Sequence, residues 1–304
     1  MRRIVVSALI ASTLAFLALT GSNPLPAADS PRNVVVFFDL HESTDGLEDA
    51  VEFIFNKLVG PNDQLIIRSP AGLYGFSRAK LAQPKAELIA LVRDKVRGDI
   101  TKGAQSYKQV INELELAVRN LEGLVLPSDV PQGGGMSGLP ETRDLSELFN
   151  FYRQALLNLT QLRKVNDASL RQLADAFRGQ QGENHIIVIF EREFRPVPRR
   201  EALNIMADMP KFAFQANEMF LTGGNKEPFD ANALAEYFKQ MTLTQHFIYL
   251  TAKKASATGN LLENSGDIYS AFSKIAGATG GSCLATAEPV DGLKAVLKTW
   301  KGSK

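Results

Sequence analysis

The polar side chains best placed to do chemistry follow two apolar segments of the chain. Asp39 and Ser43 stand at the end of the Val- and Phe-rich run 33–40, and Glu191 follows the run 185–190. Such runs are typical of strands buried on both faces of a parallel sheet. Because open α/β sheets bind ligands at the carboxyl ends of their strands, we expect Asp39, Ser43 and Glu191 to converge at one edge.

Further apolar segments complete the set of expected strands. They cover residues 33–40, 63–68, 73–76, 185–190, 246–251 and 282–287. The connection between 63–68 and 73–76 is short, so that pair should be antiparallel, whereas amphipathic segments with helical periodicity separate most of the others. This alternation predicts an α/β fold, a doubly wound and mostly parallel sheet with helices on both faces.

Helical periodicity predicts the segments between the strands. Expected helices cover residues 47–58, 84–97, 104–121, 144–177, 200–221, 230–241, 268–278 and 291–300. The stretch 98–103, which begins and ends with Gly, is expected to break a helix, and the basic stretch 195–200 is expected to form a loop. We interpret the helix-rich stretches 122–182 and 199–244 as helical insertions into a single domain that spans residues 29–304.

The strand followed by Asp39, His41 and Ser43 resembles the DxSxS motif of von Willebrand factor type A domains. The resemblance implies a doubly wound sheet with a metal-ion-dependent adhesion site, where Mg²⁺ keeps an open position for a ligand carboxylate. It also implies a Thr ligand from a later loop, which the segment 102–107 resembles; Thr101 and Ser106 are the hydroxyls nearest to that position. Residues 268–281 resemble the penultimate helix of that family and its Thr-Gly-Gly turn.

Several positions depart from the pattern of that family. His41 replaces a Ser, and imidazole suits softer ions than Mg²⁺. Ala104 falls at the Thr position, and Glu191 replaces an Asp beside Arg192, whose charge opposes cation binding. We therefore expect a degenerate site without a bound cofactor. The alternatives are a surviving Mg²⁺ site and a site for another divalent cation at Asp39, His41 and Glu191.

Charged residues surround the expected site. They are the acidic Glu42 and the basic Arg192, Arg195, Arg199, Lys253 and Lys254. One interpretation is a rim that binds a protein partner or an anionic envelope component, and the other is a solvated loop. With 34 Lys and Arg against 33 Asp and Glu, the chain has no basic field that would favour nucleic acid.

The N-terminus has the pattern of a secretory signal peptide. Arg2 and Arg3 precede an uncharged, largely apolar run, 4–20, and small residues follow it. We expect cleavage after residues 1–28, a periplasmic or secreted mature protein and no membrane span after cleavage; an uncleaved anchor is the alternative. Cys283 is the only cysteine, so no internal disulfide is expected.

The three histidines argue against a hydrolytic triad. His185 and His246 are expected near the starts of strands, at the edge opposite Asp39 and His41, so no Ser, His and acid gather at one edge. The sequence therefore predicts an exported, non-catalytic protein-interaction module. The alternatives are an envelope hydrolase that depends on a metal or on Asp39, and a structural assembly subunit that binds through its helical insertion.

Overall fold

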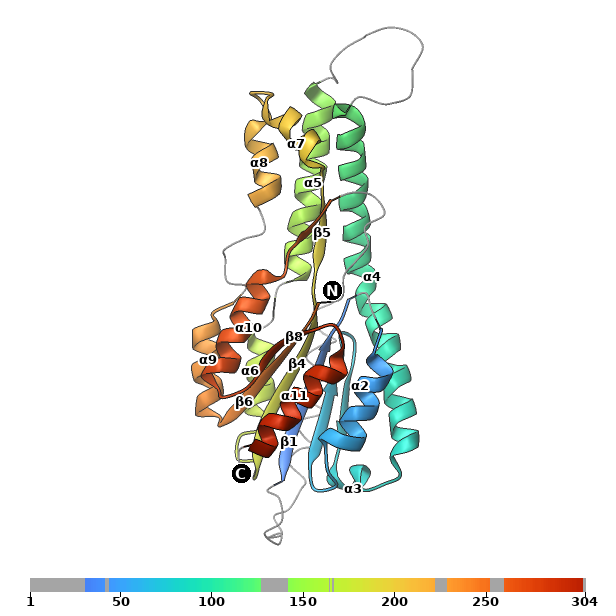
Figure 1. The fold of residues 1–304 in the computed structure, drawn as a ribbon, viewed down its shortest axis with the longest axis vertical. Coiled ribbons are helices and arrows are strands. Elements are labelled where there is room, and N and C mark those ends of the chain that lie inside the picture. Colours follow the sequence, from blue (N-terminus) through green and yellow to red (C-terminus); the bar gives the residue numbers. More distant parts are fainter. Residues whose placement is uncertain are drawn as a thin grey trace.

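The main sheet has six strands in the order β3-β2-β1-β4-β6-β8 (Figure 1). The computed structural model describes residues 31–41, 44–126, 142–163, 165, 167–221, 229–251 and 260–302. The strands are β1 (Arg32–Asp39), β2 (Gln64–Arg68), β3 (Leu73–Phe76), β4 (Glu183–Glu191), β6 (Leu243–Leu250) and β8 (Cys283–Thr286). All neighbours are parallel except β2 and β3, as the short connection between those two predicts.

Helices cover both faces of this sheet, so the predicted α/β fold is confirmed. Alternate residues of β1 enter two different cores: Val34, Val36 and Phe38 face one, and Val35 faces the other. The first core is covered by α2 (Leu47–Phe53) with its π-helical extension (Ile54–Leu58), by α3 (Arg78–Leu81), by the first half of α4 (Lys85–Val125) and by α11 (Pro289–Gly302). The second is covered by α6 (Asp167–Asp175), α9 (Ala231–Gln240) and α10 (Gly266–Ala278).

A group of helices extends beyond the carboxyl edge of the sheet (Figure 1). This helical lobe consists of residues 104–125 of α4 together with α5 (Thr142–Leu162), α7 (Arg200–Ala207) and α8 (Ala213–Leu221), and it has a third hydrophobic core. Beside it runs a two-stranded antiparallel sheet of β5 (Phe194–Val197) and β7 (Asn260–Glu263). The stretches 122–182 and 199–244 therefore divide between lobe and sheet, because α6 and α9 pack on the second core.

The helix break expected at 98–103 is wrong, because α4 continues through it. Each interior Gly costs a helix about 1 kcal/mol, but the buried stripe of Val96, Ile100 and Ala104 continues on both sides and packs against the sheet and lobe. Gly103 also has a packing reason, since a Cβ there would clash with the side chain of Pro70. Packing along the whole helix therefore outweighs the local cost of glycine.

Three other expectations about helices and loops are also wrong. The single helix expected over 144–177 is divided into α5 and α6, because its apolar residues serve two cores, one in the lobe and one under the sheet. The helix expected over 200–221 is divided into α7 and α8. The basic loop expected at 195–200 begins as β5, which pairs with the distant β7. None of the described helices is long and apolar enough to cross a membrane.

The turn after α10 shows why the sequence carries a Gly pair there. Gly280 has φ +74°, the left-handed conformation that closes many helices, and the backbone N–H of Gly281 donates to the carbonyl of Ala276 at 2.8 Å. The backbone N–H of Gln245 in β6 donates to the Thr279 hydroxyl at 3.0 Å. Gly281 lies directly against the Gln245 carbonyl, so this turn joins α10 to the start of β6.

We expect Gly281→Ala to lower the free energy of unfolding by several kcal/mol, because its methyl group would overlap the backbone of β6. Gly277→Ala is the matched control: this residue is an exposed helical glycine with open space around it, and alanine there should add about 0.5–1 kcal/mol. Urea unfolding of both variants measures the difference. Equal, small effects of the two substitutions would contradict the close approach at Gly281.

Candidate functional site

Asp39 and Glu191 meet at the carboxyl edge, as predicted. The strands β1 and β4 are parallel neighbours, and Asp39 lies opposite Phe190, the residue before Glu191. The strand order reverses between these two strands, which is where open α/β sheets form their ligand crevice. Ser43 and Glu42 lie outside the described residues, so the predicted convergence is confirmed for Asp39 and Glu191.

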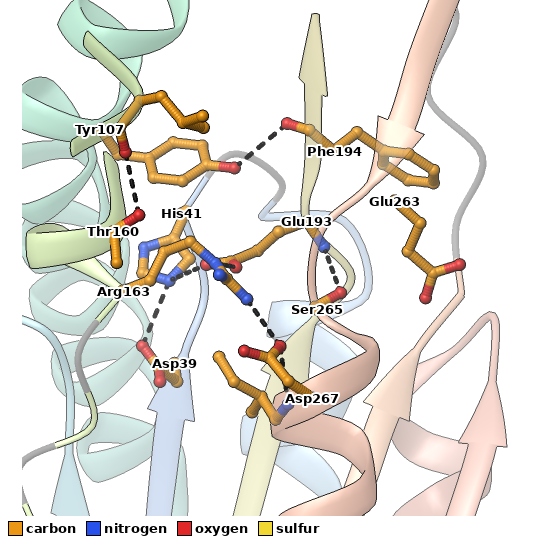
Figure 2. A network of polar contacts seen from close by, with 12 residues as sticks. Asp39, His41, Tyr107, Thr160, Arg163, Glu193, Phe194, Glu263, Ser265 and Asp267 are labelled. Carbon is orange, nitrogen blue, oxygen red and sulfur yellow. Dashed lines mark hydrogen bonds and ion pairs between the residues drawn. The ribbon is translucent and has the colours of Figure 1, made fainter. Parts of the chain in front are cut away.

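His41 lies at the centre of this edge, between two carboxylates (Figure 2). Its Nε2 is 3.4 Å from Asp39 Oδ1 and 3.4 Å from Glu193 Oε1. The backbone N–H of His41 donates to Glu191 Oε2 at 2.9 Å. The imidazole stacks on the ring of Tyr107 from α4, with centroids 5.0 Å apart and planes inclined by 18°. The position that departs from the DxSxS pattern therefore organises three carboxylates and an aromatic ring.

Arg163, which directly follows α5, is the main cation of the site (Figure 2). Its Nε donates to Glu193 Oε2, and its Nη2 donates to Asp267 Oδ1 at 3.0 Å. The side chain of Arg163 is 8% exposed and that of Glu193 is 2% exposed, so the pair is buried. The side-chain amide of Asn264 lies 3.2 Å from Arg163 Nη1 and Nε, and in one orientation its oxygen accepts from both.

Burial and pairing act in opposite directions on these two charges. Burial alone lowers the pKa of Arg163, but Glu193 and Asp267 outweigh it, so the pKa is raised and the guanidinium stays charged. Burial raises the pKa of Glu193, and Arg163 and then His41 oppose that rise. The charged form of Glu193 therefore depends above all on the guanidinium of Arg163.

Hydrogen bonds also hold the chain around Glu193 in place. The Glu193 backbone N–H donates to the fully buried Ser265 hydroxyl at 3.0 Å, and Tyr249 lies 2.7 Å from the same oxygen. The Tyr249 hydroxyl donates to Glu263 Oε1 at 2.7 Å, and Arg192 donates to the other oxygen of Glu263. Arg192, expected on a binding rim, is thus paired within the chain.

Two other expected rim residues are also engaged by the chain itself. Arg195 is fully buried: its Nη1 donates to the Tyr152 hydroxyl at 2.9 Å and its Nη2 to the Met219 carbonyl at 2.8 Å. That carbonyl lies in the last turn of α8, whose partial negative charge compensates a cation. Arg199 pairs with Glu122 at 3.3 Å. Lys253 and Lys254 lie outside the described residues.

The donor set does not fit an Mg²⁺ site of the adhesion type. Thr101 and Ser106 are exposed on α4, and the Thr101 hydroxyl donates to the Arg97 carbonyl at 3.0 Å. Within the described part of the chain, no three His, Cys, Asp or Glu side chains are arranged to hold a metal ion. Beside the expected ligands Asp39 and Glu191, the guanidinium of Arg163 already pairs with the neighbouring carboxylates of Glu193 and Asp267.

Reasoning from sequence missed Arg163 and Asp267 as members of the site. One signal for Arg163 existed, because the mostly polar stretch 163–169 interrupts the apolar stripe that was interpreted as one helix. Tyr107 belongs to the segment that resembles the metal-binding loop of the family. Its contribution to the site is an aromatic ring that stacks on His41, not a hydroxyl ligand for a metal.

The other two histidines lie near the opposite edge, as predicted. The rings of His185 and His246 are stacked, and His246 Nε2 is 3.4 Å from His185 Nδ1. The Trp300 indole donates to His246 Nε2 at 3.3 Å, and His246 Nδ1 lies 3.0 Å from the Ser282 hydroxyl. Glu183 faces His185, and the Arg32–Asp63 pair contributes to its electrostatic surroundings.

The pKa of His246 is lowered from 6.5 to about 3, mainly by burial and to a smaller extent by the neighbouring His185. Since the unfolded chain takes up this proton at a higher pH than the folded one, stability should fall as the pH drops from about 6.5 towards 3, by a few kcal/mol. His246→Gln should reduce this slope in urea unfolding at pH 7, 5.5 and 4. The slope that remains includes the contribution of His185, whose pKa is also lowered by burial. An unchanged slope in His246→Gln would contradict the linkage.

The mostly parallel sheet flanked by helices agrees with the predicted α/β fold, and the resemblance to von Willebrand factor type A domains stays a prediction. No protein-family model matches the chain, and no curated protein is significantly similar to it.

Proposed function

We propose that the chain is an exported, non-catalytic protein-interaction module of the von Willebrand factor type A kind, whose partner binds the helical lobe. The observation that carries the proposal is the distribution of exposed apolar side chains. Among the described residues, the exposed large hydrophobics of the lobe are Leu116 (49% exposed), Phe151 (39%), Leu157 (52%), Leu162 (44%) and Phe214 (76%). Outside the lobe, only Leu91 (50%) is such a residue in the described part of the chain.

The surface of the lobe supports the same assignment. The surface between α4 and α5 is shallowly hollowed beside Leu124 and Leu148. These exposed apolar side chains are distributed over α4, α5 and α8, and apolar side chains on a polar surface are contacts that protein-binding sites use. The structural-assembly alternative uses the same lobe, so both interpretations place the partner there.

The carboxyl edge supports a structural role in preference to ligand binding. A face that accepts acidic ligands needs cations with free hydrogen-bond donors. Arg192 and Arg163 already donate to Glu263, Glu193 and Asp267. Arg195 is buried. Among the described residues, the basic side chains that the sequence offers for an anionic partner, Arg192, Arg195 and Arg199, are therefore engaged within the chain.

One observation favours the hydrolase alternative as a second candidate. The side chains of Asp39 and His41 are 26% and 19% exposed, and they lie at the crevice position of the sheet. An acid beside a histidine at such a place is compatible with general acid–base chemistry. The neighbouring Ser265 is fully buried, so it is no candidate for the nucleophile of that reaction.

The partner site is tested by Phe151→Ser combined with Leu157→Ser. Because both side chains are exposed on α5, we expect the free energy of unfolding to change by less than about 1 kcal/mol, while crosslinked partner recovered from the native host drops at least tenfold. Leu91→Ser, an equally exposed Leu on the half of α4 that packs on the sheet, is the control and should leave recovery unchanged. Equal recovery with all three proteins would remove the lobe as the binding surface.

Divalent cations separate the interaction module from the metal-dependent hydrolase. We expect the melting temperature of the native chain to stay unchanged in Mg²⁺, Mn²⁺ or Zn²⁺ at about 5–10 mM, a concentration chosen to be well above the dissociation constant of a catalytic metal site. A rise of several degrees that Asp39→Ala abolishes would favour the hydrolase, because a ligand that binds only the folded state raises its melting temperature.

A further inference from the structure

We infer that the guanidinium of Arg163 takes the place of a divalent cation at the carboxyl edge, and that it thereby anchors the helical lobe to the sheet. This inference goes beyond the proposed function and holds whether or not a partner binds the lobe.

The first argument is the convergence of negative charge. Asp39 ends β1, Glu191 ends β4, Glu193 follows β4, and Asp267 lies in the first turn of α10. Asp39, Glu191 and Glu193 contact His41 at distances of 2.9 to 3.4 Å. Asp267 contacts Arg163 at 3.0 Å. A cation among such carboxylates keeps them charged, whereas without one their pKa values rise and they take up protons.

The second argument is the fit of the guanidinium. Arg163 donates through different nitrogens to Glu193 and Asp267, and Asn264 lies beside the third side of the group. A planar fork with several donors bridges carboxylates in a way that the point charge of a Lys ammonium does not. The pair is also buried, so removing one partner would leave an uncompensated charge in the interior.

The third argument is the position of Arg163 in the chain. It is the residue directly after α5, which belongs to the lobe, and α6 begins four residues later on the face of the sheet. Glu193 lies between β4 of the sheet and β5, which runs beside the lobe. The contact between Arg163 and Glu193 therefore joins two of the places where the chain crosses between lobe and sheet. A metal ion held only by the sheet edge would not make this connection.

The test uses the full chain with Arg163→Met, which keeps the length of the side chain but removes the charge, and with Arg163→Lys. We expect Arg163→Met to lower the melting temperature and to recover several degrees of it in 10 mM Mg²⁺, Ca²⁺ or Mn²⁺, since the unpaired carboxylates then accept a cation. The native chain and Arg163→Lys should not respond to these ions. Arg119→Met, on the exposed face of α4, is the control for loss of an arginine and should change neither quantity.

The double variant Arg163→Met with Glu193→Gln provides a second test, which also applies if the single variant does not fold. This variant removes the buried carboxylate together with its cation, so it should be more stable than Arg163→Met alone and should respond less to the divalent cations. A purely steric role for Arg163 predicts the reverse: no rescue by Glu193→Gln and no response to cations in any variant. Either of these two results, or an Arg163→Met variant as stable as the native chain, would overturn the inference.

Discussion

The parallel register of β1 and β4 is the constraint on which the rest of this structure depends. Because the two strands run side by side in the same direction, the acidic residues that follow them reach the same edge. Carboxylates brought together in a partly buried place need positive charge nearby. Here Arg163 and His41 provide the cationic and hydrogen-bonding partners from within the chain. Arg163, which lies where the lobe meets the sheet, thus pairs with two of these carboxylates, Glu193 and Asp267.

The elements of the sheet were predictable because each depends on a short and local pattern. The run around Val35 is apolar on both faces and reads as a buried strand, and the short link between β2 and β3 leaves only antiparallel pairing. The meeting of Asp39 with Glu191 follows from strand direction and sheet order, which are general properties of doubly wound sheets. The same reasoning places His185 and His246 near the opposite edge, because they lie close to the starts of strands that end at the carboxyl edge.

What could not be predicted depends on contacts between residues far apart in the sequence. Gly98 and Gly103 are local signals for a helix end, but the packing of α4 along its whole length overrides them. Arg195 has the composition of an exposed loop, yet β5 pairs with β7, some sixty residues later, and buries its guanidinium against α5 and α8. The role of Arg163 could not be predicted for the same reason, because its partners Glu193 and Asp267 come from other elements. Charged residues reveal their role only when their partners are known.

The mechanical consequence concerns how the lobe presents its surface. A helix of 41 residues is about 60 Å long, and α4 uses its first half to cover the sheet and its second half to form the core of the lobe. The lobe is therefore attached to the sheet by a continuous helix at one side and by the buried Arg163–Glu193 contact at the other. Attachments at both sides restrain rotation of the lobe about α4, and with it the exposed apolar side chains of α5. A surface held in this way binds a partner without first losing conformational freedom, which is the main cost that a flexible insertion would add.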